Sequence, residues 1–105
     1  MKTDIDLDMW VAENVFKCYW ISKNRQRLQW NKDDRVVCIP HYTSDMNEAI
    51  KVLRYFHGTL SHDSVEWNVG TVFDLEKFVA YHAKPAKAIC LAAYKLETGE
   101  DWNNK

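Results

Sequence analysis

The 105-residue sequence has few of the features that mark membrane, secreted or nucleic-acid-binding proteins. It contains three glycines and two prolines and has no repeat, low-complexity tract or linker, so we expect a single domain over residues 1–105. It also has no excess of charge of one sign. The formal net charge of −1 argues against a general affinity for nucleic acid or an anionic membrane. No stretch resembles a signal peptide or a membrane span, so we expect no membrane partner.

Cysteine is also scarce, with widely spaced residues at positions 18, 38 and 90. An odd number at these spacings does not predict a disulfide framework, and reduced thiols in a cytoplasm are the simplest interpretation. Cys38 and His41 have the spacing of one zinc-ligand pair, but no second close pair accompanies them. Cys38 and Cys90 fall in apolar segments, where a free thiol packs as a small hydrophobe. The sequence therefore predicts neither a metal site nor a cofactor.

Signatures of catalysis are missing as well. There is no glycine-rich phosphate loop and no nucleophile elbow. His57, His62 and Asp63 lie near Gly58 and could in principle support acid–base chemistry, but a solvated loop after a helix is the favoured interpretation. We therefore expect a protein that is not an enzyme.

Aromatic residues are abundant, with five Trp, five Tyr and four Phe, and apolar periodicity predicts the elements that carry them. Helices are expected over residues 4–17, over 45–57 with Gly58 as the terminating glycine, and over 85–98 with Gly99 in that role. Strands are expected on both sides of residues 22–26, at 35–39, at 65–69 and at 78–81, with a turn at 74–77 and a bulge at Gly70. This order predicts an α+β fold, an α/β/α sandwich in which three helices pack on a mostly antiparallel sheet.

The stretch IPHYTSDMNEAI (39–50) is the first candidate binding site. Asp45 and Glu48 have the spacing of a capping box, which suggests a strand end followed by a helix cap. Alternatively, the free N–H groups at the helix start, together with His41 and Tyr42, form a ligand-binding corner. Because Asp45 would compete with an anion there, a ribose or a base edge suits this corner better than a phosphate.

The stretch WISKNRQRLQW (20–30) is the second candidate. Cations interleaved with aromatic residues suit stacking on a base together with contacts to phosphates, although a charged hairpin tip is the plainer interpretation. The candidate ligand-binding residues are, in full, Trp20, Arg25, Arg27, Trp30, Arg35, His41 and Tyr42.

Three segments, MWVAENVFK, IPHYTSDMNEAIKVL and KPAKAICLAAYKL, together resemble the phage ABA sandwich family. The matching residues are Ala12, Glu13 and Val15, then Pro40, Tyr42, Thr43, Ser44 and Asp45, then Pro85, Ala88, Ile89, Cys90, Ala92 and Ala93. The resemblance implies an α/β/α sandwich of phage origin and no established activity. Two departures stand out: Ala83–Lys84 replaces a capping Ser or Thr before the last helix, and residues 18–35 match no family segment.

These observations together lead to a functional hypothesis. We expect a non-enzymatic phage protein that acts in the host cytoplasm as a homo-oligomer and counters host defence by sequestering a nucleotide-derived immune signal. The alternative is a protein–protein inhibitor that binds a host or defence enzyme through exposed tryptophans. A purely structural or regulatory accessory protein is a third possibility.

Overall fold

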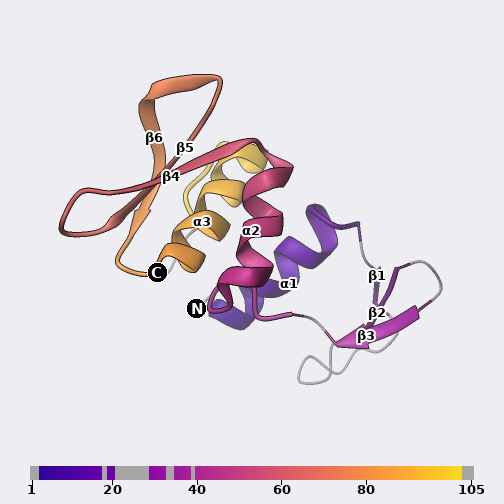
Figure 1. The fold of residues 1–105 in the computed structure, drawn as a ribbon. Helices are drawn as coiled ribbons and strands as arrows, with labels where there is room; N and C mark the ends of the chain where they lie inside the picture. Colours follow the sequence, from indigo (N-terminus) through magenta and orange to yellow (C-terminus); the bar gives the residue numbers. More distant parts are fainter. Residues whose placement is uncertain (1–2, 18, 21–28, 33–34, 39, 103–105) are drawn as a thin grey trace.

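The computed structural model describes residues 3–17, 19–20, 29–32, 35–38 and 40–102, and side chains in 3–17, 40–74 and 77–102. In chain order the elements are α1 (Asp4–Asn14), β1 (Tyr19–Trp20), β2 (Gln29–Lys32), β3 (Arg35–Cys38), α2 (Met46–Tyr55), β4 (Gly58–His62), β5 (Trp67–Thr71), β6 (Asp74–His82) and α3 (Pro85–Thr98) (Figure 1). Every pair of neighbouring strands is antiparallel. The predicted α+β class, with helices packed on antiparallel strands, is confirmed.

The described strands form two three-stranded sheets, β1-β2-β3 and β4-β5-β6. The three helices lie between them in Figure 1, where the end of the β5–β6 hairpin projects beyond the helices. Helix α3 packs on β5 and β6 on one side and against α2 and α1 on the other. The first sheet follows α1 directly and leads into α2, so both ends of the segment that carries it are attached to the helical layer.

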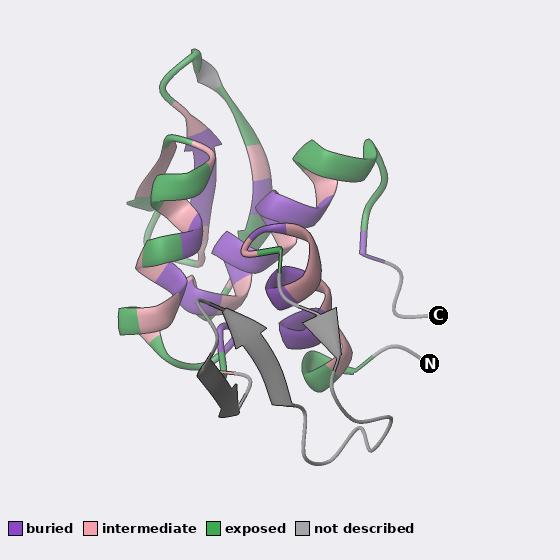
Figure 2. Ribbon diagram, turned by 90° about the vertical axis from the view of Figure 1, so that its right-hand side faces the viewer, coloured by how far each residue is buried: buried purple, intermediate pink, exposed green. Residues whose placement is uncertain are grey.

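The hydrophobic core lies among the helices and the inner face of β5 and β6, as the buried segments in Figure 2 show. Four alanines of α3 are buried and let the neighbouring elements approach its backbone closely. The predicted stripe of this helix is confirmed at Ile89, Ala92 and Ala93 but wrong at Leu96, which is 45% exposed. The largest fully buried side chains are Tyr42, Leu7, Ile89, Val11, Val52, Val69 and Cys90.

The helix ends follow the sequence signals closely. Thr3 caps α1 in a full capping box with Asp6, and the helix ends at Asn14, three residues before the predicted boundary. Lys84 caps α3 without a side-chain hydrogen bond, as its departure from the family pattern predicts. Gly99 adopts the left-handed conformation (φ 76°) after α3, so its predicted role is confirmed.

The predicted role of Gly58 is wrong. The left-handed residue after α2 is His57 (φ 54°), and Gly58 already begins β4. A Cβ atom at Gly58 would collide with the Leu53 and Phe56 side chains, which would have to move to admit it. Strand β4 itself was expected to be loop, since GTLSH has a single large apolar residue. Its pairing with β5, through Leu60 opposite Val69, is a tertiary interaction.

The predicted turn at residues 74–77 is also misplaced. The chain reverses at Val72 and Phe73, and Asp74 already pairs with Thr71 at the start of β6. The apolar pair at the turn does not resemble a turn sequence, which explains the error. The irregularity at Gly70 is confirmed, because the β5–β6 register shifts on both sides of it. A Cβ atom at Gly70 would lie 2.7 Å from the Lys77 carbonyl oxygen.

Candidate functional site

The seven predicted ligand-binding residues fall into three groups. Arg25 and Arg27 lie outside the described residues. Trp20, Trp30 and Arg35 lie in β1, β2 and β3, where the backbone defines their register. The remaining two, His41 and Tyr42, lie in the turn between β3 and α2, which is described with its side chains.

The register brings the two tryptophan positions of the first sheet together. Trp20 is the direct partner of Trp30, and Trp30 is also opposite Val37. Two residues along the same strands, Lys32 is opposite Arg35. Because residues directly opposite one another and residues two apart share a face, positions 20, 30, 32, 35 and 37 fall on one face of this sheet. Sequence reasoning identified three of them and missed Lys32, which is two residues beyond Trp30 on the same strand.

The turn at residues 40–45 is a strand-to-helix connection, as its capping pattern predicts. The His41 carbonyl oxygen accepts hydrogen bonds from the Ser44 and Asp45 amides, at 3.1 and 2.8 Å. The Asp45 side chain then accepts the Asn47 amide at 2.9 Å and caps α2. Glu48 contacts Lys51 in the next turn of the helix, at 3.2 Å. The cap at Asp45 is thus confirmed, but the predicted capping box with Glu48 is wrong, because the Asp45 amide donates to the His41 carbonyl and the Glu48 carboxylate contacts Lys51.

His41 and Tyr42 point in different directions. The His41 side chain is 77% exposed, so it is available to a ligand. Tyr42 is 2% exposed, and its ring stacks on Phe16, with centroids 5.2 Å apart and an interplanar angle of 15°. The structure therefore corrects the expectation for Tyr42 as a pocket wall: its ring belongs to the core, since both its faces lie within the packed interior.

Asp8 is a residue of this corner that sequence reasoning missed. It lies on α1 and is 4% exposed, and its Oδ1 accepts the Thr43 amide at 2.8 Å. Its Oδ2 lies 3.8 Å from Nδ1 of His41. Burial raises the pKa of Asp8, and the Thr43 amide and hydroxyl together with His41 act in the opposite direction. The available signal was the position of Asp8 beside the apolar stripe that contains Leu7 and Val11. An aspartate near the start of a helix is, however, usually assigned to helix capping.

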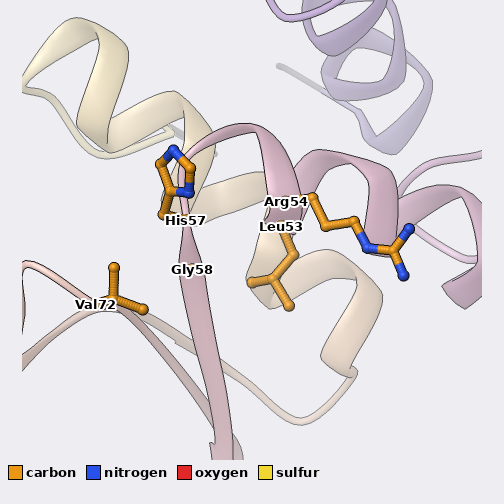
Figure 3. A pocket seen from close by; sticks show the side chains of 5 residues that line it. All are labelled: Leu53, Arg54, His57, Gly58 and Val72. Atoms are coloured by element: carbon orange, nitrogen blue, oxygen red, sulfur yellow. The ribbon is translucent and has the colours of Figure 1, made fainter.

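A second feature lies at the far end of α2. Leu53, Arg54, His57, Gly58 and Val72 line an open hollow of about 330 Å³ (Figure 3). The Arg54 guanidinium points away from its centre in that view, which leaves mainly apolar atoms inside. Next to it, the Phe73 side chain is 79% exposed and touches His57 edge to face, with centroids 5.6 Å apart. Nothing in the sequence pattern indicated this hollow.

The described side chains bring no metal-binding cluster together. They contain no group of three or more His, Cys, Asp or Glu side chains arranged to hold a metal ion. Cys90 is buried, and burial raises the pKa of its thiol, which favours the neutral form. His57 precedes β4 and His62 is its last residue, while Asp63 accepts the Val65 and Glu66 amides within its own turn. These backbone donors lower the pKa of Asp63.

The fold and these sites describe a small α+β sandwich protein. A family model, the phage ABA sandwich domain, matches residues 9–94. Because the match covers most of the chain, the chain belongs to the phage ABA sandwich domain family, and the predicted resemblance is confirmed. It is thus a phage protein of this family.

Comparison with solved structures agrees with this assignment. The chain is similar to a phage protein from Bacillus cereus ATCC 14579, with a TM-score of 0.75 and 17% sequence identity. The match covers 98% of this chain and 94% of the other. At this identity the likeness establishes the fold alone. No curated protein matches the sequence. Among the described helices, none has the length and apolar character needed to cross a membrane.

Proposed function

We propose that this phage protein is a non-enzymatic binding protein that sequesters a nucleotide-derived immune signal in the host cytoplasm. The observation that carries the proposal is the strand register of the first sheet, which places Trp20, Trp30, Lys32 and Arg35 on one face. Indole rings stack on nucleobases, and Arg and Lys side chains bind phosphate groups. A sheet face that combines two tryptophan and two cationic positions suits a small ligand with both parts.

The pairing of Lys32 with Arg35 gives this proposal an energetic basis. Like charges directly opposite one another destabilise an antiparallel ladder. An anion bound beside both residues removes that repulsion, so the sheet gains stability together with affinity. Arg25, Arg27 and the exposed His41 complete the proposed set of cationic contacts. We further propose that the protein is a homo-oligomer in which neighbouring subunits share the ligand-binding pockets.

Native mass spectrometry combined with calorimetry tests this function. Protein purified from cells with an active nucleotide-signalling defence is expected to be oligomeric and to carry a small phosphorylated ligand. Purified protein is expected to bind ADP-ribose or a cyclic dinucleotide, with at least tenfold weaker binding after Trp30→Ala or Arg35→Ala. Phe73→Ala, on the second sheet, is the matched control and should leave binding unchanged. A ligand-free monomer that gives no heat with either nucleotide would overturn the proposal.

A second candidate function, inhibition of a host or defence protein, is favoured by the exposed apolar residues of the second sheet. Phe73, Phe78 and Tyr81 are 79%, 41% and 51% exposed, and Phe73 flanks the hollow in Figure 3. Among the tryptophans whose side chains are described, Trp10 and Trp67 are half-buried and Trp102 is buried, so in this part of the chain the exposed surface is formed by Phe and Tyr. Exposed apolar patches of this kind mark protein interfaces.

The two functions are separated by a pair of variants. If the protein is an inhibitor, Phe73→Asp abolishes a stoichiometric complex with the defence enzyme, whereas Arg35→Ala and added nucleotides leave the complex intact. If the protein instead sequesters a nucleotide, Arg35→Ala abolishes nucleotide binding, whereas Phe73→Asp leaves it intact. Size-exclusion chromatography of the complex and calorimetry with ADP-ribose provide the two readouts.

A further inference from the structure

We infer that Asp8 is a positioning residue of the proposed ligand site, where its buried carboxylate holds the exposed His41 imidazole and the turn that carries it against α1. The inference deepens the proposed function, on which it rests, because it takes His41 as one of the ligand contacts. Neither the spacing of residues nor the family resemblance singles out Asp8.

Asp8 contacts two residues of one turn, Thr43 and His41. Oδ1 accepts the Thr43 amide at 2.8 Å, a bond that spans 35 positions in the chain. Oδ2 lies 3.8 Å from His41 Nδ1. Because the two ring nitrogens of histidine lie on different edges, a ring with Nδ1 toward Asp8 directs Nε2 elsewhere. The 77% exposure of the side chain leaves that second edge accessible.

A structural role alone does not require a charge at this position. The Thr43 amide and hydroxyl, which both hydrogen-bond to Asp8, need only an acceptor, which the carbonyl oxygen of an asparagine would also supply. Burying a carboxylate is unfavourable, and burial accordingly raises the pKa of Asp8. A carboxylate differs from the amide of an asparagine in its negative charge. In the described part of the chain, the group that can carry a positive charge and faces this carboxylate is His41. The charge therefore has a role when His41 is protonated.

The other titratable groups near Asp8 do not replace His41 in this role. Asp4, one helical turn earlier, carries the same sign, and its carboxylate contacts the Lys87 ammonium at 2.8 Å. Cys90, on α3, is buried and neutral, and Asp8 is one of the groups that raise the pKa of its thiol. From α1, α3 and the turn, only the His41 side chain offers Asp8 an opposite charge together with solvent access.

The test is a double-mutant cycle with Asp8→Asn and His41→Gln, using ADP-ribose as the probe. Asp8→Asn is expected to weaken binding at least fivefold at pH 6 and less at pH 8. In the His41→Gln background, the same change should have no further effect. Asp101→Asn, on an exposed aspartate remote from the turn, is the matched control. An equal loss of binding from Asp8→Asn with and without His41 would overturn the inference and assign Asp8 a structural role.

Failure of the proposed function gives a different result. If the wild-type protein binds no nucleotide, the same four proteins are compared by urea unfolding at pH 6 and pH 8. Non-additive effects on stability at pH 6 that become additive at pH 8 support the pairing of Asp8 with protonated His41. Additive effects at both values would overturn it, whichever ligand the protein binds.

Discussion

Two strand-to-helix corners of this protein use similar residues in different ways. The first, at residues 40–45, leads from β3 into α2 and contains Pro40 and His41. The second, at residues 82–85, leads from β6 into α3 and contains His82 and Pro85. In the first corner Asp45 caps the helix with its side chain. In the second, Lys84 provides no side-chain cap, and its amide donates to His82 Nδ1 at 3.0 Å.

The difference lies in where each corner obtains its stability. The first is held by tertiary contacts, with α1 through the Asp8 carboxylate and with the residues just after α1 through the ring stacking of Phe16 on Tyr42. The second relies on Pro85, whose fixed φ suits the first helical position, and on the buried alanines that follow it. A corner that follows a well-packed strand therefore needs fewer side-chain hydrogen bonds and ring contacts than a corner that packs against a helix distant in the sequence.

Truncation of the tyrosine in each region gives the largest expected contrast. Tyr42→Ala removes a buried ring that stacks on Phe16, and we expect it to lower the free energy of unfolding by about 3–5 kcal/mol. Tyr81→Ala, beside the second corner, removes a side chain that is 51% exposed and should cost less than about 1 kcal/mol. Urea unfolding measures both. Similar losses for the two variants would contradict the contrast between the corners.

Exchanging the capping residues should change stability in opposite directions. Asp45→Ala leaves the Asn47 amide without its side-chain acceptor and is expected to destabilise the protein by about 1 kcal/mol. Lys84→Ser introduces a cap that α3 lacks and is expected to stabilise it by a similar amount, about 1 kcal/mol. Thermal and urea unfolding are suitable measurements, with exposed Ser44→Ala as the control. If Lys84→Ser does not raise the stability, the backbone N–H groups at the start of α3 already have hydrogen-bond partners.

The first corner should lose stability as pH rises. Burial raises the pKa of Asp8 above its ordinary value of 3.8, so the folded protein holds this proton more tightly than the unfolded chain. The contribution of protonated Asp8 to the free energy of unfolding is fully present below pH 3.8 and is lost as pH rises through the folded-state pKa. Relative to wild type, Asp8→Asn should therefore gain stability as pH rises from 3.8 through the folded-state pKa of Asp8. A constant difference across that range, measured by urea unfolding, would contradict the prediction.

The second corner should show a smaller effect of opposite sign. Burial, followed by the positive charge of Lys87, lowers the pKa of His82 below its ordinary value of 6.5. The folded state therefore disfavours the charged imidazole, and stability rises as pH increases through the folded-state pKa toward 6.5. Because the side chain is partly exposed, the effect is modest. His82→Gln should remove it, so that the variant's stability changes less with pH between 5 and 7 than that of wild type.

Much of the fold could be predicted because local signals agree with tertiary packing. Capping residues and the apolar periodicity predicted three helices, and Gly70 predicted an irregular strand. Strand β4 and the turn at Val72–Phe73 could not be predicted. GTLSH carries almost no apolar pattern, and an apolar pair is an unusual turn, so pairing across the sheet decides both.

The candidate site shows the same division. Aromatic and basic residues near Trp20 and Trp30 indicated a binding surface, and only the register of β1, β2 and β3 added Lys32 to it. The sequence also suggested His41 and Tyr42 as a pair. The structure separates them, because neighbouring residues in a turn point in different directions.

By itself, the sequence determined the fold class, the family and most helix ends, since these depend on periodicity, caps and three characteristic segments. Only the tertiary structure decided that Tyr42 is core, that Phe73 is surface and that Asp8 reaches the turn before α2. A carboxylate on one helix and an amide 35 residues later share no local pattern. Their contact exists because the helices pack, and packing depends on the whole chain at once.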